Sequence, residues 1–576
     1  MLKQVNNGNV AMQIAQIIAQ RGQDKVFLFP GGTIAPLMEG LDAHGSQLIC
    51  TRHEQGAGYA ALAVAKLTGK AQAVLVSSGP GVTNIVTPIA DAYYDSVPLV
   101  IFTGQVGVKD MRRSQKHRQA GFQEVDTARM LAPITKQIFI VKTPEDALMM
   151  TRIAFDIAQN GRPGPVVVDL PMSTQLAELT RPKILPDLAA PALPEAHLQA
   201  IDQFVDSYLD ALKTSKKPLL LVGNGVRLAK AQKKLAVFAK RTAMPYTQSL
   251  PALGTLPSKV GLMSASLGFH GHTGMQAAGL AMQQADLCLV LGSRLDVRQT
   301  GTEIEQFMPE AKLFRVELDP AEIKYRRIKK GAILNADMNH VLDKLIDRLA
   351  RDSLPNLQSW NAELTQLKRQ HPLPMGRDGA LTVQRIVAAV DEATKGAPVT
   401  VTTGVGSHQQ WAARHFSYDA PNRNWLTSAG LGAMGFDLPA SIGAAMANPD
   451  HTILCFVGDG SVQMNIQELA TIAELNLPIK IFCMDNRRFG IVSQFQKTKW
   501  DQDLACNDKQ NPDFAALAAA YGIKGIRLDH LADMGGVIAD ALKDQSPCFI
   551  HCSVDQAEDI SPMLLAGETL DKMSKA

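Results

Sequence analysis

The sequence predicts an α/β protein made of three doubly wound parallel-sheet domains. Apolar runs of roughly four to eight residues alternate with amphipathic segments along the chain, which is typical of parallel sheets covered by helices on both faces. The 576 residues exceed the roughly 250 to 300 at which a single hydrophobic core stops growing, so several domains are expected. With 46% hydrophobic and 20% charged residues, the composition is that of a globular rather than a disordered chain.

Charge and hydropathy exclude several classes of function. The 58 Lys and Arg residues against 55 Asp and Glu leave a formal net charge of +3, without the basic excess of a nucleic-acid or anionic-membrane binder. No stretch of about 18 apolar residues predicts a membrane span, and the N-terminus lacks the apolar core of a signal peptide. The seven scattered cysteines indicate reduced thiols rather than a disulfide framework. We therefore expect a cytoplasmic protein with no nucleic-acid or membrane partner.

We place the N-terminal domain at residues 1–182. Its predicted strands are residues 25–29, 73–77, 98–103 and 165–170, with amphipathic segments between them. The segment at 181–196 has the sequence RPKILPDLAAPALPEA, whose four prolines favour an extended connector over a helix. A first domain boundary is therefore expected there.

The same alternation predicts a central domain at residues 195–350 and a C-terminal domain at 375–576. The predicted strands of the central domain are 218–222, 286–292 and 312–318. Those of the C-terminal domain are 398–403, 452–457, 479–485 and 547–554. The stretch between these domains, 354–378, contains HPLPMGRDG and is expected to be irregular.

The most specific motif lies in the C-terminal domain, where the strand ILCFV runs into Gly458-Asp459-Gly460-Ser461. A helix, QMNIQELATIAEL, is expected next, and the following strand ends at Asn486, 27 residues after Asp459. In a right-handed βαβ unit both residues lie at the carboxyl ends of neighbouring strands, where open sheets bind ligands. Asp and Asn oxygens, with a loop carbonyl from Arg488, are ligands that Mg²⁺ prefers. A GDG turn alone is common, but the joint pattern predicts a magnesium and phosphate site.

A second motif, Thr51-Arg52-His53-Glu54-Gln55, opens a helix of small residues in the N-terminal domain. A zinc-protease helix is excluded, because the position four residues after His53 is Ala57 rather than a second His. A Glu that opens a helix among small apolar residues is desolvated, which suits its carboxyl group to share a proton. The alternative is a Glu that only stabilises the helix start.

Together these motifs resemble those of the thiamine diphosphate enzymes, and the chain is similar to the acetolactate (acetohydroxyacid) synthase family over nearly its entire length. The matching stretches are FPGGTIAPL, TRHEQGAGYAA, SSGPGVTN, DSVPLVIFTGQV, GFQEVD, GRPGPVVVDLP, GSRLDVRQTG, GLGAMGFDLPASIGA and SPMLLAGE. The resemblance implies a pyrimidine-binding N-terminal domain, a nucleotide-binding-like central domain and a C-terminal domain that binds diphosphate and Mg²⁺. It also implies a homodimer or homotetramer, since in this superfamily the cofactor lies between the first domain of one subunit and the third of another.

The resemblance assigns roles residue by residue. Glu54 is expected to share a proton with N1′ of the aminopyrimidine, Gly32 to lie near the reactive carbon, and Met434 to be the apolar wedge beneath the cofactor. Phe122 and Gln123 match the active-site mouth, and Lys136 matches a substrate-channel lysine. The other expected thiamine diphosphate-binding residues are Pro80, Asn84, Gly406, Ser407, His408, Gly432, Gly460, Ser461, Phe489, Gly490 and Ile491. The expected metal ligands are Asp459, Asn486 and, through its carbonyl, Arg488.

The resemblance of the central domain implies a bound FAD. The residues in matching segments are Gly223, Gly225, Arg294, Asp296, Arg298 and Glu317. A GNG turn before a helix is a reasonable nucleotide cradle, but the full GxGxxG pattern is missing. Many members of the superfamily keep this domain without a flavin.

The implied activity is that of a carboligase, which decarboxylates pyruvate and transfers the two-carbon unit to a second 2-keto acid. The chain departs from the family where the acceptor is chosen: Thr33 and Ser407 replace Ala and Gln, and Phe495 stands where biosynthetic members have Trp. The acceptor therefore stays open between a 2-keto acid and a nucleotide-linked keto sugar or other ketone. Simple decarboxylation is a further alternative, and a regulatory subunit is compatible with the sequence but not indicated by it.

A basic cluster lies immediately before Phe122. Its members are Lys109, Arg112, Arg113, Lys116, His117 and Arg118. It is either a solvated loop or a binding site for an anionic acceptor larger than pyruvate, because Arg groups bind phosphate in a bidentate manner.

Overall fold

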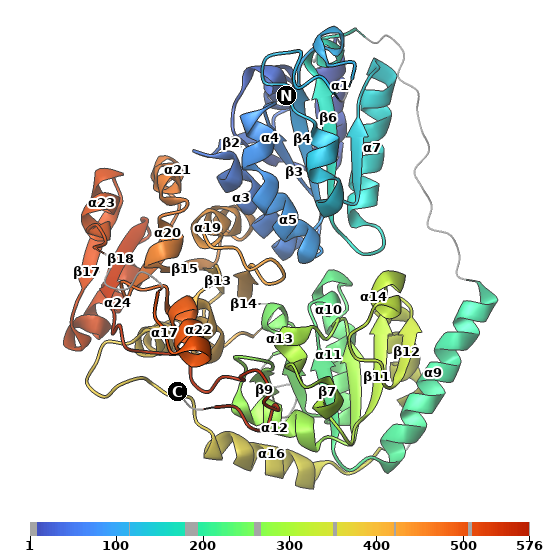
Figure 1. Cartoon of the computed structure of the whole chain (residues 1–576), viewed down its shortest axis with the longest axis vertical. Coiled ribbons are helices and arrows are strands. Elements are labelled where there is room, and N and C mark those ends of the chain that lie inside the picture. The colour runs from blue at the N-terminus through green and yellow to red at the C-terminus, as the bar shows by residue number, and fades with distance from the viewer. Residues whose placement is uncertain are drawn as a thin grey trace.

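The computed structural model describes residues 8–114, 116–178, 194–257, 266–349, 354–419, 422–504 and 510–574. Within these ranges the chain forms three six-stranded parallel sheets with helices packed on them, so the predicted fold class is confirmed. The N-terminal sheet lies at the top of Figure 1, the central sheet at the lower right and the C-terminal sheet at the left. None of the described helices is both long and apolar enough to cross a membrane.

The N-terminal sheet has the strand order β2-β1-β3-β4-β6-β5. Its strands are β1 (Lys25–Leu28), β2 (Gln47–Cys50), β3 (Gln72–Val76), β4 (Leu99–Gln105), β5 (Gln137–Ile140) and β6 (Pro165–Pro171). Its helices are α1 (Val10–Gln20), α2 (Ala35–Ala43), α3 (Glu54–Thr68), α4 (Pro80–Asn84), α5 (Val86–Tyr94), α6 (Thr127–Leu131), α7 (Pro144–Gln159) and α8 (Met172–Gln175). Strands β3, β4 and β6 are completely buried, as expected for the centre of a parallel sheet.

The central sheet has the order β12-β11-β10-β7-β8-β9. Its strands are β7 (Pro218–Val222), β8 (Tyr246–Gln248), β9 (Ser266–Phe269), β10 (Leu287–Leu291), β11 (Lys312–Glu317) and β12 (Ala332–Asn335). Its helices are α9 (Glu195–Thr214), α10 (Gly225–Leu228), α11 (Gln232–Thr242), α12 (Gln276–Gln284), α13 (Val297–Thr300), α14 (Pro320–Lys324) and α15 (Met338–Leu349). Phe204 and Tyr208 of α9 pack edge-on against Phe314 of β11, which holds this long helix on the sheet.

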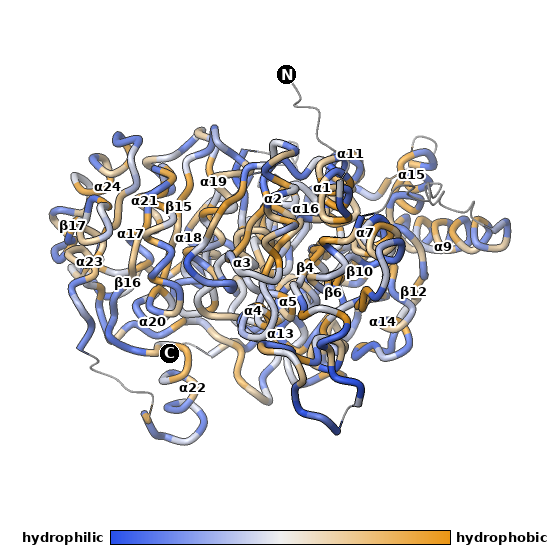
Figure 2. Tube along the Cα trace, turned by 90° about the horizontal axis from the view of Figure 1, so that it is seen from above, coloured by the Kyte–Doolittle hydropathy of each residue, from blue (hydrophilic) through white to orange (hydrophobic). Residues whose placement is uncertain are grey.

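The C-terminal sheet has the order β14-β13-β15-β16-β18-β17. Its strands are β13 (Val399–Thr403), β14 (Arg423–Thr427), β15 (Thr452–Gly458), β16 (Ile479–Asp485), β17 (Lys524–Leu528) and β18 (Cys548–Ser553). Its helices are α17 (Val383–Ala393), α18 (Ser407–His415), α19 (Asp437–Ala447), α20 (Asp459–Val462), α21 (Leu469–Glu474), α22 (Gly490–Trp500), α23 (Phe514–Ala520) and α24 (Met534–Lys543). Seen from above, α22 extends from the lower left of the molecule and α9 from its right side (Figure 2).

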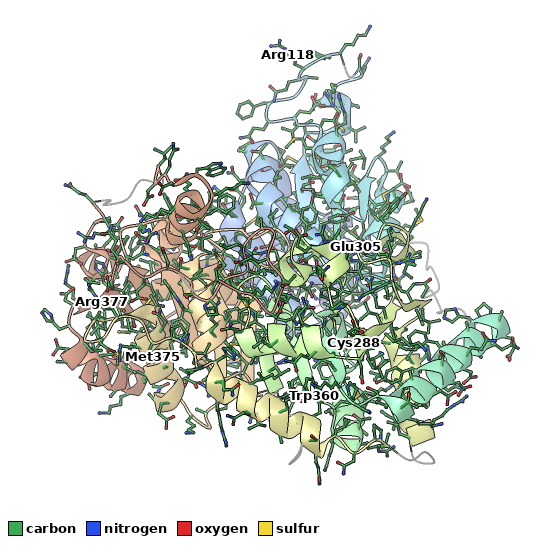
Figure 3. All side chains as sticks on the ribbon, turned by 60° about the horizontal axis from the view of Figure 1, so that its bottom comes forward. Arg118, Cys288, Glu305, Trp360, Met375 and Arg377 are labelled. Atoms are coloured by element: carbon green, nitrogen blue, oxygen red, sulfur yellow. The ribbon has the colours of Figure 1, made fainter. Side chains whose placement is uncertain are left out.

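The expectation of an irregular segment at 354–378 is wrong for Gln358–Gln370, which form helix α16. Trp360, Leu364 and Leu367 follow a helical spacing and pack against the central domain. The indole Nε1 of Trp360, which is labelled in Figure 3, donates to a backbone carbonyl of β7, that of Pro218, at 3.1 Å. The predicted connector at 181–196 lies mostly outside the described residues, and the domain limits at 182, 195, 350 and 375 stay predictions.

The helix expected at residues 463–475 forms only in part, because it begins with a 3-10 turn at Ile466–Glu468 that continues into α21, and it is separated from the short helix α20 before it. The chain leaves helical geometry at Asn465, whose Nδ2 donates to the carbonyl of Gly435 at 2.7 Å. The break brings Glu468 against the start of α3, where its carboxylate accepts the N–H of Arg52 at 3.0 Å. Burial raises the pKa of Glu468 to about 7.

Helix α3 of the N-terminal domain packs directly on helix α19 of the C-terminal domain. A Cβ atom on Gly443 would lie 2.0 Å from the carbonyl oxygen of Ala60, so only glycine permits this approach. Next to it the rings of Tyr59 and Phe436 meet edge-on with centroids 5.4 Å apart. The cores of the two domains are therefore continuous through these helices.

This packing predicts that Gly443→Ala destabilises the protein, although Ala favours a helix more than Gly does. The added methyl group forces α19 away from α3 and overpacks the interface, at a cost of about 1 to 3 kcal/mol. We expect a lower thermal unfolding midpoint. Gly536→Ala in α24 is the matched control, because no atom lies within 4 Å of that position. Equal midpoints for the two variants would contradict the proposed role of this contact.

Candidate active site

The C-terminal half of the candidate site is a cavity at the carboxyl ends of β13, β15 and β16, here named the C-terminal cavity. Its volume is about 170 Å³. Strands β15 and β16 pair with Gly458 opposite Met484, which places Asp459 and Asn486 at the same edge of the sheet. The predicted site residues that line the cavity are Gly406, Ser407, His408, Met434, Asp459, Gly460, Ser461, Asn486, Arg488, Phe489, Gly490 and Ile491. Gly432 is the one C-terminal member of the prediction that does not line it.

The polar groups behind Asp459 form a network that the sequence did not reveal. Asn511 Nδ2 donates to Asp459 Oδ2 at 2.7 Å and to Asp485 Oδ1 at 2.8 Å. His551 Nε2 lies 2.9 Å from the other oxygen of Asp485. Burial alone raises the pKa of Asp485, but the bonds from His551, Asn511 and the N–H of Arg487 outweigh it and hold the pKa below its usual value. The ionised form of Asp485 is thus stabilised beside Asp459, and the negative charge and oxygen atoms at this edge favour a bound cation.

The oxygen atoms at this edge suit Mg²⁺ rather than a metal held wholly by protein side chains. The described residues contain no group of three His, Cys, Asp or Glu that could hold a metal alone. Mg²⁺ is usually bound by one or two carboxylates together with phosphate oxygens and water. The guanidinium of Arg488 binds the carbonyl of Gln556 and pairs with Asp559, so its charge is already neutralised, which is compatible with the predicted role of the backbone carbonyl.

Glycines bring the backbone close to whatever fills the C-terminal cavity. A Cβ atom on Gly460 would lie 2.7 Å from the ring of Phe489 and 3.2 Å from the methyl group of Met434. Gly406 has φ of +158°, and a Cβ atom there would meet the His408 ring at 2.5 Å. Side chains at these positions would fill the space, so backbone amides form the floor, as in sites that bind anions.

The N-terminal half of the site begins with Glu54, the first residue of α3, which is only 5% exposed. Asn84 Nδ2, at the end of α4, donates to Glu54 Oε2 at 3.0 Å. Pro80 starts the same short helix, directly after Gly79. A Cβ atom on Gly79 would lie 2.9 Å from Gln123, so Gln123 packs on this turn. The structure therefore brings Glu54, Pro80, Asn84 and Gln123 into one region.

For the other N-terminal residues of the prediction, the structure shows no contact with Glu54. Phe122 is 84% exposed, and Gly32 has no atom within 4 Å of its Cβ position. Lys136 Nζ donates to the carbonyls of Ile157 and Asn160 at the end of α7 and lines none of the three cavities described here. That placement gives its expected substrate-channel role no support.

The predicted N-terminal site residues do not line the C-terminal cavity of the same chain. All residues that line the C-terminal cavity belong to the C-terminal domain, and none comes from α3 or α4. Large apolar side chains near the two halves are exposed to solvent: Phe122 by 84%, Phe495 by 49% and Trp500 by 54%. Phe495 and Trp500 of α22 contact each other edge-on at 5.3 Å. Clusters of exposed apolar side chains are candidate surfaces for contact with a partner or a ligand.

A larger cavity of about 500 Å³, here named the central cavity, lies at the carboxyl ends of the central strands. Gly225, Arg294, Asp296, Arg298 and Glu317 line it, as do Asn160 and Arg162 of the N-terminal domain and Gly430 of the C-terminal domain. Gly223 lies beside it, where a Cβ atom would be 2.1 Å from the carbonyl oxygen of Gly292.

Two histidines of the central cavity were not predicted as site residues, although His270 lies in the stretch SLGFHG (266–271), which also resembles the acetolactate synthase family. His270 and His272 both line the cavity. Burial lowers the pKa of each to about 4, so both are neutral near pH 7. Neutral rings and nearby arginines suit a nucleotide with an aromatic base and phosphates.

Comparison with known families matches all three domains. Residues 8–130 match the family described as thiamine pyrophosphate enzyme, N-terminal TPP binding domain. Residues 205–345 match the thiamine pyrophosphate enzyme central domain, and residues 404–552 match the C-terminal TPP binding domain.

Curated relatives match over nearly the full length. The chain is 35% identical to the acetolactate synthase isozyme 2 large subunit of Escherichia coli, over 98% of this chain and 100% of that protein. It is 37% identical to the isozyme 1 large subunit of the same organism, over 97% and 96%. It is 33% identical to the mitochondrial catalytic subunit of acetolactate synthase from Saccharomyces cerevisiae, over 97% and 82%. The chain therefore belongs to the acetolactate synthase family of thiamine diphosphate-dependent enzymes.

Proposed function

We propose that the protein is an acetolactate synthase-type carboligase, which decarboxylates pyruvate and transfers the two-carbon unit to a second carbonyl compound. The proposal rests on two features of the same chain. Asp459 and Asn486 lie side by side at the ends of β15 and β16, and a buried Glu54 opens α3. A non-catalytic relative would need neither the metal-binding residues nor the buried glutamate. The names of the relatives support the same reaction.

The residues at the C-terminal cavity fit thiamine diphosphate and Mg²⁺. Asp459, Asn486 and the carbonyl of Arg488 would hold the metal, and the backbone around Gly406 and Gly460 would receive the diphosphate. Met434 lies against the Gly460 position as an apolar support for the ring system. When bound, thiamine diphosphate supplies the nucleophilic carbon that attacks the keto group and stabilises the charge left by CO₂.

The residues of this chain position groups and control protons. Asn84 occupies Oε2 of Glu54, which leaves Oε1 to share a proton with a ring nitrogen. The burial of Glu54 removes competing water from that contact. Exclusion of water also protects the reacting carbon, because its protonation would release an aldehyde instead of a ligation product.

We infer that the active unit contains at least two chains. Glu54 and the C-terminal cavity belong to separate regions of one chain, and exposed aromatic residues lie near both. A second chain related by a twofold axis would place its Glu54 at the first chain's C-terminal cavity, and the reverse. Two equivalent sites would then form across one interface.

We also propose that the central cavity binds FAD. Its volume of about 500 Å³ is in the range of cofactor sites, and Arg294 and Arg298 provide charge for the phosphates. Glu317, at the end of β11, is placed to accept hydrogen bonds from ribose hydroxyls. The close approach of Gly223 and Gly225 to Gly292 shapes the turn that faces the nucleotide.

The direct test of the proposed function is product identification. With pyruvate, thiamine diphosphate and Mg²⁺, we expect CO₂ and acetolactate. Glu54→Gln should lower kcat by at least about 100-fold, because the amide cannot share the proton. The control Glu39→Gln changes an exposed Glu of the same domain and should retain full activity. Acetaldehyde as the sole product would contradict the carboligase, and an active Glu54→Gln variant would contradict the role of Glu54.

The flavin proposal predicts about one FAD per chain in the purified protein, visible by its absorbance and released on denaturation. Arg294→Gln should lower the affinity for FAD by about tenfold, since it removes one charge-assisted bond to phosphate. Arg369→Gln, an exposed arginine of α16, is the matched control. Colourless protein that neither binds added FAD nor responds to it would overturn the assignment.

A further inference from the structure

The N-terminal domain has a cavity of its own, to which the proposed reaction assigns no role. This N-terminal cavity, of about 790 Å³, lies at the carboxyl ends of β1, β4 and β6. Its lining includes Thr33, which follows Gly32, and Phe122, which precedes Gln123. The cavity therefore adjoins two segments that the resemblance places in the active site.

The basic cluster supplies one wall of this cavity. Lys109, Arg112, Arg113 and His117 line it, whereas Lys116 and Arg118 of the same cluster do not. Figure 3 shows Arg118 at the tip of the loop, extended away from the body of the domain. The structure thus divides the cluster into residues that face the cavity and residues on the outer surface.

Charge in the cavity is only partly neutralised. The guanidinium of Arg112 pairs with Asp126, and Asp110 is the one carboxylate in the lining. Among the described residues, Lys109 and Arg113 form no ion pair. The cavity therefore keeps an excess of positive charge, which favours an anion.

The loop that carries these cations is held in a defined shape. The buried carboxylate of Glu124 accepts the N–H of Arg112 at 2.7 Å, of Ala120 at 2.8 Å and of Gly121 at 3.3 Å. At its other end the N–H of Val108 donates to Ser173 Oγ at 3.0 Å. These hydrogen bonds hold both ends of the loop on the domain, so the backbone positions of Lys109 and Arg113 are fixed.

We propose that the N-terminal cavity binds the phosphate of a phosphorylated carbonyl compound, and that Lys109 and Arg113 select this compound as the acceptor. The inference rests on the proposed carboligase function. The volume of about 790 Å³ leaves room for an acceptor larger than pyruvate, of the size of a sugar. Two cations without partners suit a phosphate better than a single carboxylate.

The reaction at this site is balanced without any further reactant. The bond between the keto and carboxylate carbons of pyruvate breaks, and CO₂ leaves. A new bond forms between the former keto carbon and the carbonyl carbon of the acceptor. The acceptor's carbonyl oxygen takes one proton and becomes a hydroxyl group, and the phosphate is unchanged.

The test compares dihydroxyacetone phosphate with dihydroxyacetone as acceptors for the holoenzyme and pyruvate. We expect kcat/KM to favour the phosphorylated compound by at least about tenfold, and the double variant Lys109→Gln, Arg113→Gln to lose this preference through a higher KM. The matched control is Lys116→Gln, Arg118→Gln, which removes the same charge from the outer surface of the loop. Equal preference in the two double variants, or none in the wild type, would overturn the proposal.

A binding measurement separates this inference from the carboligase itself. With thiamine diphosphate and Mg²⁺ saturating, inorganic phosphate should bind the wild type and the outer-surface variant, and the cavity variant should bind it at least about tenfold more weakly. Unchanged phosphate binding in the cavity variant would contradict the site even if acetolactate were formed. Phosphate binding without preference for the phosphorylated acceptor would identify a site for the free anion and would also overturn the proposal. If the wild type formed no acetolactate from pyruvate alone, the proposed function itself would be refuted.

Discussion

The close contact between α3 and α19 is the constraint on which the rest of the structure depends. Gly443 lets the two helices approach until the backbone of Ala60 fills the space of a side chain. The same helices carry Tyr59 and Phe436, and Glu468 binds the backbone at the start of α3. This contact fixes the direction of α3 and hence the place of Glu54. No residue of α3 or α4 lines the C-terminal cavity of the same chain, and this separation is the basis of the proposed two-chain site.

All three cavities follow one rule of parallel sheets, that ligands bind at the carboxyl ends of the strands. The three cavities differ in the charge of the side chains on the loops that follow the strands. Asp459 and Asp485 make the C-terminal edge acidic and suited to a cation, which in turn suits a diphosphate. Arginines and Glu317 give the central cavity the mixed charge of a nucleotide site. Lys109 and Arg113 leave the N-terminal cavity basic. A chain with a net charge near zero thus contains one acidic, one mixed and one basic cavity.

Sequence patterns predicted the interior strands of the sheets, except β8, and missed the edge strands. Every apolar run taken as a strand forms one, whereas the six edge strands and β8 went unrecognised. An edge strand has a single neighbour and need not be apolar: β2 buries only Ile49 fully, and β17 only Leu528. At the site, the GDG and Asn motif and the helix that begins at Glu54 could be recognised because each is a local pattern. The roles of Asn511 and His551 could not be recognised, because the fold brings them to Asp459 and Asp485 from 52 and 66 residues away. Helix α16 was missed because the prolines and glycine that follow it outweighed the spacing of Trp360 and Leu364.

The proposed two-chain site can be tested by mixing two inactive variants. Glu54→Gln removes the N-terminal half of each site and Asp459→Asn removes the metal-binding half. If each site takes Glu54 from one chain and Asp459 from another, a mixed dimer holds one intact site. Refolding or exchanging the two variants in equal amounts should then restore about a quarter of the wild-type acetolactate synthesis, since half of the dimers are mixed and each has one working site of two. Activity that stays at the level of the separate variants, in a sample shown to contain mixed dimers, would contradict the two-chain site.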